Sequence, residues 1–327
     1  MSGETKFQDR IAYKGNLNQP LNIICRDYNL GAYQGHEVVL VGYEDFNVIL
    51  QTSKGKFFVK FFGEFRTNEG CERYVTIIRK TIEAGVREPK LFESGQGYIS
   101  HFMVENARLR SIVMEYINGK TFYELGRPLT ENEARETVRQ AAFINSVSYQ
   151  PKFIYDSWAI PSFLKEYRAV ETLLPSSDQA LIQPLVDEFE KTNIDSLPHA
   201  LVHGDIIKTN VMLSREGQIY IIDFAVTNYY PRIQELAVIL SNMLFDTNHL
   251  ELFTMYYKIA LDEYQKTIQL TSQELLLLPF FTKVQHAMHI VGAVREEKIK
   301  NNTPSAEDDY LLNQGRKGLA FMLGFKG

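Results

Sequence analysis

Residues 203–224 read HGDIIKTNVMLSREGQIYIIDF, and this stretch decides the fold. Two short runs rich in apolar residues, 210–213 and 219–222, flank turn-forming residues 214–218, a pattern that predicts a β-hairpin. Counting outward from the turn places Asn210 opposite Asp223 to within one position, and cross-strand neighbours have Cβ atoms roughly 5 Å apart. Asp205, Asn210 and Asp223 are therefore expected to converge at the open end of the hairpin.

An Asp and an Asn at this spacing suit one small cation. Mg²⁺ prefers one or two carboxylate or carbonyl oxygens, with substrate phosphates and water completing its octahedron. The sequence thus predicts Asn210 and Asp223 as metal ligands and leaves Asp205, five residues before Asn210, as a base. His203 stands immediately before the turn, a position that favours a structural hydrogen-bonding role over that of a base.

The order His-Gly-Asp-x-x-x-x-Asn, apolar strand, Asp-Phe resembles the catalytic and metal loops of the protein-kinase-like phosphotransferases. It is similar in particular to the branch of aminoglycoside phosphotransferases, choline kinases and homoserine kinases. The resemblance implies an α+β, bilobal protein-kinase-like fold. Its small antiparallel β-rich lobe with one helix, which binds nucleotide, would be residues 1–116, and its larger, mainly helical catalytic and acceptor-binding lobe residues 117–327. It also implies ATP and Mg²⁺ as cofactors and Asp205 as the catalytic residue that accepts the acceptor's proton.

The sequence around Lys60 indicates a phosphate-binding role independently of the motif, because Lys60 lies in an otherwise apolar strand at residues 57–61. A buried ammonium is costly without anionic partners, and phosphates would supply them. In the kinase fold the corresponding Lys contacts the α- and β-phosphates and pairs with a Glu of the next helix. Glu72 is preferred for that pairing, with Glu69 as the alternative, although Glu72 could equally be an ordinary solvated residue.

Other nucleotide contacts follow from the resemblance alone. The loop at residues 42–47 lies where this fold covers the triphosphate, but Gly42 is its one glycine, whereas the protein-kinase loop has three. Adenine would meet the linker at residues 114–117, where the backbone groups of Glu115 and Ile117 would carry it. Gly42, Glu115 and Ile117 therefore join Lys60 and Glu72 as expected cofactor-binding residues.

The stretch after Asp223 bears on the acceptor. Protein kinases carry a long activation segment there, on which a peptide lies. Here only a short stretch separates Asp223 from Glu235, which favours a hydroxyl of a small molecule such as an aminoglycoside, an amino-alcohol or a hydroxy-amino acid. Glu235 replaces an Asp that braces the catalytic loop in relatives; a brace and a plain helix residue both stay open. Lys208 is open between a phosphate contact and surface solvation.

Two alternatives are weighed against a small-molecule kinase. A protein kinase acting on a partner is disfavoured by the short stretch after Asp223. A nucleotide-binding pseudokinase with a regulatory role is disfavoured because Lys60, Asp205, Asn210 and Asp223 are all present. Neither the identity of the acceptor nor the oligomeric state can be derived from the motifs, because acceptor specificity is set by pocket side chains.

Composition excludes several other classes of protein. The 327 residues are 45% apolar and 23% charged, which is typical of a folded globular chain. The net charge of −5 argues against a general nucleic-acid binder. The longest apolar stretch, residues 275–281, is too short to span a membrane, and the N-terminus has no apolar core of a secretory signal. With two cysteines and no disulfide framework, we expect a cytoplasmic protein without nucleic-acid or membrane partners.

The hydrophobic period divides the chain into two regions. Strands are expected at 37–41, 47–52 and 56–62, a helix at 68–84 ending at Gly85, and a strand pair at 98–104 and 111–116. A leading helix at 21–30 would end at Gly31. The rest is expected to be mainly helical apart from the hairpin, with helices beginning after the capping-box residues Thr130 and Thr271.

Overall fold

The structure is a computed structural model that describes residues 8–40, 45–300 and 306–325. The chain divides into two compact units: unit 1 comprises residues 1–82 and 88–118, and unit 2 comprises residues 83–87 and 119–327. The expected boundary after residue 116 lies two residues before the end of unit 1 at residue 118, and the short segment 83–87 belongs with unit 2.

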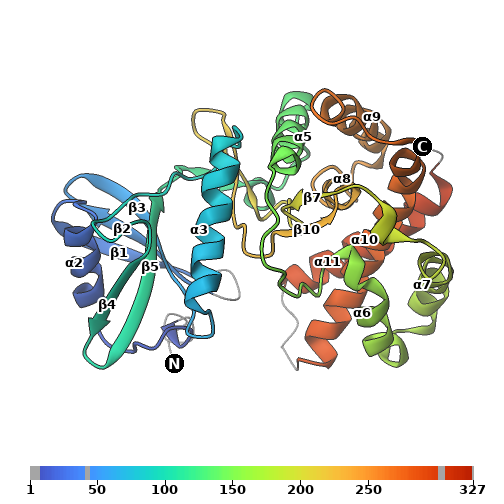
Figure 1. Ribbon diagram of the computed structural model, residues 1–327. Helices are drawn as coiled ribbons and strands as arrows, with labels where there is room; N and C mark the ends of the chain where they lie inside the picture. Colours follow the sequence, from blue (N-terminus) through green and yellow to red (C-terminus); the bar gives the residue numbers. More distant parts are fainter. Residues whose placement is uncertain (1–7, 41–44, 301–305, 326–327) are drawn as a thin grey trace. The chain divides into compact units, whose positions relative to one another are not determined.

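Unit 1 is built on a five-stranded antiparallel sheet with the strand order β1-β2-β3-β5-β4. In Figure 1 helix α2 lies on one side of this sheet and helix α3 on the other. The elements are α2 (Asn18–Asp27), β1 (Tyr33–Val39), β2 (Phe46–Thr52), β3 (Gly55–Phe61), α3 (Asn68–Glu83), β4 (Ser100–Val104) and β5 (Ala107–Glu115).

Alternation along the strands sends opposite sets of side chains to the two faces of the sheet. On β3, Val59 and Phe61 are fully buried in the apolar core that α2 covers. Lys60 between them therefore points to the opposite face, where it meets Tyr74 of α3. Because β3 is the central strand, with Asn47 and Ile112 paired beside Lys60, the ammonium is held deep in unit 1.

The end of α2 differs from the prediction. The helix ends at Asp27, and Asn29, with φ of +53°, is the left-handed residue that follows it. The amide of Leu30 donates to the Cys25 carbonyl (2.8 Å), which is the Schellman pattern of a helix end. Asn takes the left-handed position more readily than most residues, so the helix stops before Gly31. The expected stop at Gly85 is confirmed, with φ of +93° just beyond α3.

Unit 2 is mainly helical, with short strands that form two small antiparallel sheets, β6-β8-β9 and β10-β7. The strands are β6 (Gly119–Thr121), β7 (His199–Val202), β8 (Val211–Ser214), β9 (Ile219–Ile221) and β10 (Asn228–Pro231). The helices are α4 (Phe122–Leu125), α5 (Glu131–Ser146), α6 (Phe163–Val170), α7 (Ser176–Phe189), α8 (Ile233–Ser241), α9 (Phe253–Tyr264), α10 (Ser272–Lys298) and α11 (Ala306–Gly324). Short 3-10 turns occupy Ile160–Ser162, Glu171–Leu173, Ile194–Ser196 and Leu250–Leu252.

The predicted helix starts are confirmed at both capping boxes. Thr130 accepts a hydrogen bond from the backbone of the third residue of α5, and Thr271 does the same for α10. In Figure 1 helices α10 and α11 run side by side, in agreement with their extensive contacts. Among the described helices, none combines the length and the apolar character that crossing a membrane requires.

Candidate active site

The β8–β9 hairpin brings its polar residues together at its open end. Val211 pairs with Ile221, and the amide of Ile222 donates to the carbonyl of Asn210 (2.9 Å). Asn210 therefore lies opposite Ile222, one position from Asp223, as the count from the turn predicted. Asp223 has φ of +66°, a conformation uncommon outside glycine, and its side chain is exposed while that of Phe224 is buried.

His203 holds the loop that leads to the hairpin. Its Nδ1 accepts a hydrogen bond from the amide of Asp205 (3.1 Å), so Nε2 carries the proton and donates to the carbonyl of Ile222 (3.2 Å). The ring packs edge-on against Phe224, with centroids 4.4 Å apart. Burial lowers the pKa of His203 to about 4, so the imidazole is neutral. Since both ring nitrogens are engaged, His203 acts as a scaffold and not as a base.

Glu235 braces the same loop from α8. Its carboxylate accepts hydrogen bonds from the amides of His203 (2.6 Å) and Gly204 (3.3 Å) and from the side chain of Asn145 (3.2 Å). Burial raises the pKa of Glu235 to about 7. Of the two roles left open by the sequence, the structure shows the brace. Gly204, with φ of +80°, is the residue at which the loop turns.

Asp205 and Asn210 are hydrogen-bonded partners within the loop. The side-chain nitrogen of Asn210, Nδ2, donates hydrogen bonds to Asp205 Oδ2 (2.6 Å) and to the backbone carbonyl of Asp205 (3.1 Å). This contact turns the other end of the amide, the Asn210 oxygen, away from Asp205. Asp205 is only partly buried, so its carboxylate combines a fixed orientation with access from solvent.

Asn210 and Asp223 can supply part of the coordination shell of Mg²⁺, with the other positions left to phosphate and water. The Asn210 oxygen and the exposed Asp223 carboxylate are oxygen donors one register position apart, as the hard cation requires. Within residues 8–40, 45–300 and 306–325, no three His, Cys, Asp or Glu side chains form a group that could hold a metal ion. Phosphate oxygens and water would therefore have to complete the octahedron, which is the usual way proteins bind Mg²⁺.

Of the two roles that the sequence left open for Lys208, the structure excludes surface solvation. Its side chain is buried and its ammonium lies 3.5 Å from Asp246 Oδ2, and it donates to the carbonyl of Phe245 (3.4 Å). Burial lowers the pKa of Lys208 despite the nearby carboxylate. Its backbone amide also donates to the side chain of Asn242 (3.0 Å). Lys208 therefore ties the catalytic loop to the end of α8.

In unit 1, Lys60 is paired with a carboxylate that the sequence did not suggest. Its Nζ lies 3.3 Å from Asp45 Oδ2 and 5.3 Å from the centre of the Tyr74 ring. Asp45 also accepts hydrogen bonds from the Gly63 amide (3.0 Å) and Arg66 Nε (2.8 Å). Burial acts to raise the pKa of Asp45, but the two cations outweigh it and the pKa is lowered. Asp45 therefore stays ionised and keeps a buried positive charge compensated.

Glu72 does not face Lys60 in the structure. Its side chain is exposed on α3, whereas Tyr74 is buried and covers the ammonium. Residues two apart on an α-helix point about 200° apart, so a helix that turns Tyr74 towards Lys60 turns Glu72 away. Glu69, the alternative, is likewise exposed. The structure thus gives Lys60 the carboxylate partner Asp45, and the expected role of Glu72 or Glu69 stays a prediction.

The remaining residues expected to bind the cofactor are Gly42, Glu115 and Ile117. Gly42 lies outside the described residues. Glu115 ends β5, and its amide donates to the carbonyl of Lys90 (2.8 Å), while Ile117 is largely buried two residues later. Because the Glu115 amide is already engaged, a ligand would have to use its carbonyl.

Two features of the site were missed from the sequence. Asp45 lies within the loop 42–47 that is expected to cover the phosphates, and only its burial reveals its pairing with Lys60. Asn145 of α5 donates to the Leu201 carbonyl (2.8 Å) as well as to Glu235, and it accepts from the Tyr264 hydroxyl (2.7 Å). Asn145 lies in the last turn of α5 and is buried, and a buried amide there demands polar partners.

The catalytic-loop geometry, the hairpin and the five-stranded sheet define a protein-kinase-like phosphotransferase. A model of the phosphotransferase enzyme family matches residues 36–267, and the chain belongs to this family. The predicted family, the α+β protein-kinase-like fold and the enzyme class are thereby confirmed.

Solved structures share this fold at low sequence identity. An amicoumacin kinase in complex with AMP-PNP, Ca²⁺ and Ami is 17% identical with a TM-score of 0.66, and the match covers 98% of this chain and 96% of that one. Spectinomycin phosphotransferase in complex with ADP and spectinomycin is 14% identical with a TM-score of 0.68, covering 94% and 97%. A choline kinase from Streptococcus pneumoniae is 14% identical with a TM-score of 0.57, covering 94% and 99%.

Proposed function

We propose that this phosphotransferase is an ATP- and Mg²⁺-dependent kinase that phosphorylates a hydroxyl group of a small molecule. The observation that carries the proposal is the oriented Asp205 carboxylate, hydrogen-bonded to Asn210 at the end of the hairpin that also presents Asp223. The named ligands of the similar structures, AMP-PNP and ADP, support an adenine nucleotide as the phosphoryl donor.

Asp205 would act on the acceptor hydroxyl. Its Oδ2 accepts a hydrogen bond from the side chain of Asn210, which orients the carboxylate that would in turn orient the hydroxyl and accept its proton. In phosphoryl transfer the protein forms few covalent bonds with the substrates, so positioning of the reacting groups supplies much of the catalysis. Glu235 and His203 keep the loop backbone in place for it.

Asn210 and Asp223 would hold the Mg²⁺ ion. When bound, the ion supplies positive charge that neutralises the phosphate oxygens. The left-handed backbone of Asp223 turns its carboxylate outward, where it is accessible to a metal-nucleotide complex.

Lys60 would bind the nucleotide phosphates, with Asp45 in place of a helix Glu as its carboxylate partner. In our proposal adenine contacts the carbonyl of Glu115 and the amide of Ile117, because the Glu115 amide is bonded to Lys90. The loop that begins at Gly42 is proposed to cover the phosphates, and Glu72 is assigned no contact.

A small acceptor is favoured by the chain that follows Asp223. This segment forms β10, which pairs with β7, and α8 begins at Ile233. Most of the chain between Asn228 and Glu235 therefore lies in a strand or a helix. No long segment is left between Asp223 and Glu235 on which a peptide could lie. Similar structures are named as a kinase of amicoumacin, a phosphotransferase of spectinomycin and a kinase of choline, which supports a small-molecule acceptor. Two buried, unpaired cysteines and the use of ATP favour the cytoplasm.

The test is acceptor-dependent release of ADP. The purified protein is incubated with Mg-ATP and a panel of aminoglycosides, amino-alcohols and hydroxy-amino acids, beside Asp205→Asn and the exposed control Asp195→Asn. We expect release with one acceptor class, abolished in Asp205→Asn and retained in Asp195→Asn. Transfer to a peptide library and to none of the small molecules would show a protein kinase, and ATP binding without any transfer would show a pseudokinase.

A further inference from the structure

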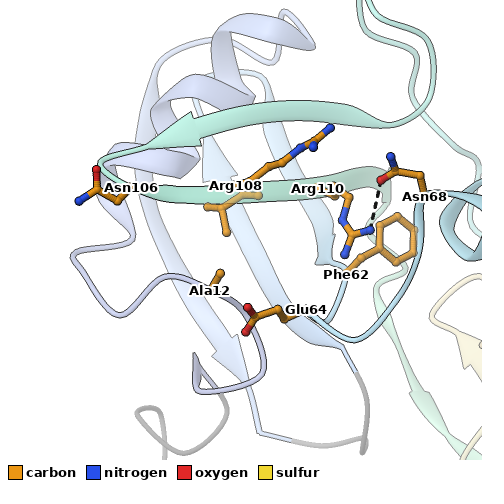
Figure 2. A pocket seen from close by; sticks show the side chains of 8 residues that line it. Ala12, Phe62, Glu64, Asn68, Asn106, Arg108 and Arg110 are labelled. Atoms are coloured by element: carbon orange, nitrogen blue, oxygen red, sulfur yellow. Dashed lines mark hydrogen bonds between the residues drawn. The ribbon is translucent and has the colours of Figure 1, made fainter.

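A pocket of about 360 Å³ opens in unit 1 at a place that the proposed reaction does not use. It is bordered by β5, by the connection between β3 and α3, and by the chain near Ala12. Figure 2 shows Arg108 and Arg110 along β5, Asn68 at the start of α3, and Glu64 beside Ala12.

Charged residues of both signs line the pocket together with apolar residues. Arg108 and Glu64 are exposed, and neither side chain has a hydrogen bond or an ion pair with another described residue. Phe62 and Leu109, which also border the pocket, are buried. Arg108, Arg110 and Glu64 thus contribute charges of both signs to the lining of a single concave space.

This arrangement has the chemistry of a site for a small molecule that bears both an anionic and a cationic group. Guanidinium groups bind carboxylate or phosphate through paired, charge-assisted hydrogen bonds, and a carboxylate does the same for an ammonium. A simple anion would satisfy Arg108 and Arg110 but would be repelled by Glu64. The positive end of α3, a helix of 16 residues, adds to the attraction for the anionic group.

The pocket is connected to Lys60 by two short chains of contacts. In the first, Arg110 donates to the Gly63 carbonyl (3.2 Å), the Gly63 amide donates to Asp45 (3.0 Å), and Asp45 pairs with Lys60 (3.3 Å). These contacts lie within unit 1 and involve consecutive partners, so a shift of Arg110 bears directly on the carboxylate that holds Lys60.

The second chain runs through aromatic rings. Phe62, which lines the pocket, packs edge-on against Tyr74 with ring centres 5.8 Å apart. Tyr74 in turn covers the ammonium of Lys60 at 5.3 Å. A ligand that presses on Phe62 therefore acts on Tyr74, the ring that covers the ammonium of Lys60.

We propose that this pocket is an effector site for a small zwitterion, whose anionic group binds Arg108 and Arg110 and whose ammonium group binds Glu64, and that its occupancy changes the affinity for ATP. Binding of a zwitterion in this pocket does not depend on the proposed function. The effect on ATP affinity rests on the proposed function, because that effect requires Lys60 to contact the nucleotide.

Binding is tested by calorimetry with three probes: O-phosphoethanolamine, which has both charges, inorganic phosphate, and ethylamine. The full chain is compared with Arg108→Gln, Glu64→Gln and the control Arg26→Gln on α2, whose side chain is 77% exposed. We expect phosphoethanolamine to bind more tightly than either single-charge probe. Each pocket variant should weaken that binding about tenfold or more, and Arg26→Gln should leave it unchanged.

Coupling is tested by measuring the Kd for Mg-ATP with and without saturating phosphoethanolamine. Two linked sites alter each other's affinity by the same factor, and we expect about fivefold or more in the full chain and none in Arg108→Gln. Absence of saturable binding, or binding that Arg108→Gln and Glu64→Gln leave intact, overturns the site. Equal binding of phosphate alone overturns the role of Glu64. Pocket binding with an unchanged Kd for ATP overturns the coupling, whereas failure to bind ATP at all counts against the proposed function and leaves the binding result standing.

Discussion

Replacing Glu235 by glutamine should remove a specific part of the pH dependence of stability. The pKa of Glu235 is about 7 in the folded protein, against 4.5 for an ordinary glutamate, because of burial. The folded state therefore retains a proton that the unfolded state releases, and stability falls as the pH rises from 4.5 through 7. At 1.36 kcal/mol per pH unit this amounts to about 3 kcal/mol in total, most of it lost between pH 5 and pH 8.

Glutamine keeps the shape of the side chain but cannot ionise. In the variant the side-chain NH₂ would face the backbone amide of Gly204, and the free-energy cost of that contact does not depend on pH. The free energy of unfolding of Glu235→Gln, measured relative to the parent, should therefore rise by about 2 to 3 kcal/mol from pH 5 to pH 8. His203 has a lowered pKa and so destabilises the fold as the pH falls below 6.5, but it is present in both proteins and cancels in the difference.

The assay is urea unfolding at several pH values, followed by the fluorescence of Trp158. This is the chain's one tryptophan and it lies in unit 2 with Glu235, so it reports on the relevant part of the protein. Glu251→Gln, which removes an exposed carboxylate, is the control. A stability difference between Glu235→Gln and the parent that stays constant from pH 5 to pH 8 would refute the reasoning.

Three further substitutions test other parts of the structure. Lys60→Met should weaken Mg-ATP binding by about 10- to 100-fold in calorimetry, because one or two charge-assisted hydrogen bonds to phosphate are lost; unchanged affinity would remove Lys60 from the site. Thr271→Ala should lower the free energy of unfolding by about 1 kcal/mol through loss of the α10 cap, and no loss would contradict the capping box. Gly318→Ala should cost about 1 to 3 kcal/mol, because the added Cβ would lie 2.0 Å from a ring atom of buried His286; Gly324→Ala, which meets open space, should not.

Local signals explain why so much of the architecture could be predicted. The β8–β9 hairpin follows from turn residues between two apolar runs, and the starts of α5 and α10 follow from Thr130 and Thr271, whose capping partners are three residues away. The convergence of Asn210 and Asp223 required only a count from the turn. Each of these depends on residues close together in sequence, where spacing fixes geometry.

Side-chain partners that come from distant segments could not be derived in this way. The pairing of Lys60 with Asp45 joins two residues that are 15 positions apart, and the direction of the Glu72 side chain depends on the phase of α3. The burial of Lys208 against Asp246 likewise depends on the end of α8 lying beneath the catalytic loop. Such contacts are set by tertiary packing, which periodicity does not report.

The central claim is that Asp205 accepts the proton of the acceptor hydroxyl while other residues bind the nucleotide. The most direct measurement compares kcat and the Kd for Mg-ATP in the parent and in Asp205→Asn, with the acceptor found in the panel. The account predicts that kcat falls by about 10²- to 10⁴-fold while the Kd for Mg-ATP stays within about twofold. Turnover of Asp205→Asn at the parent rate would contradict it.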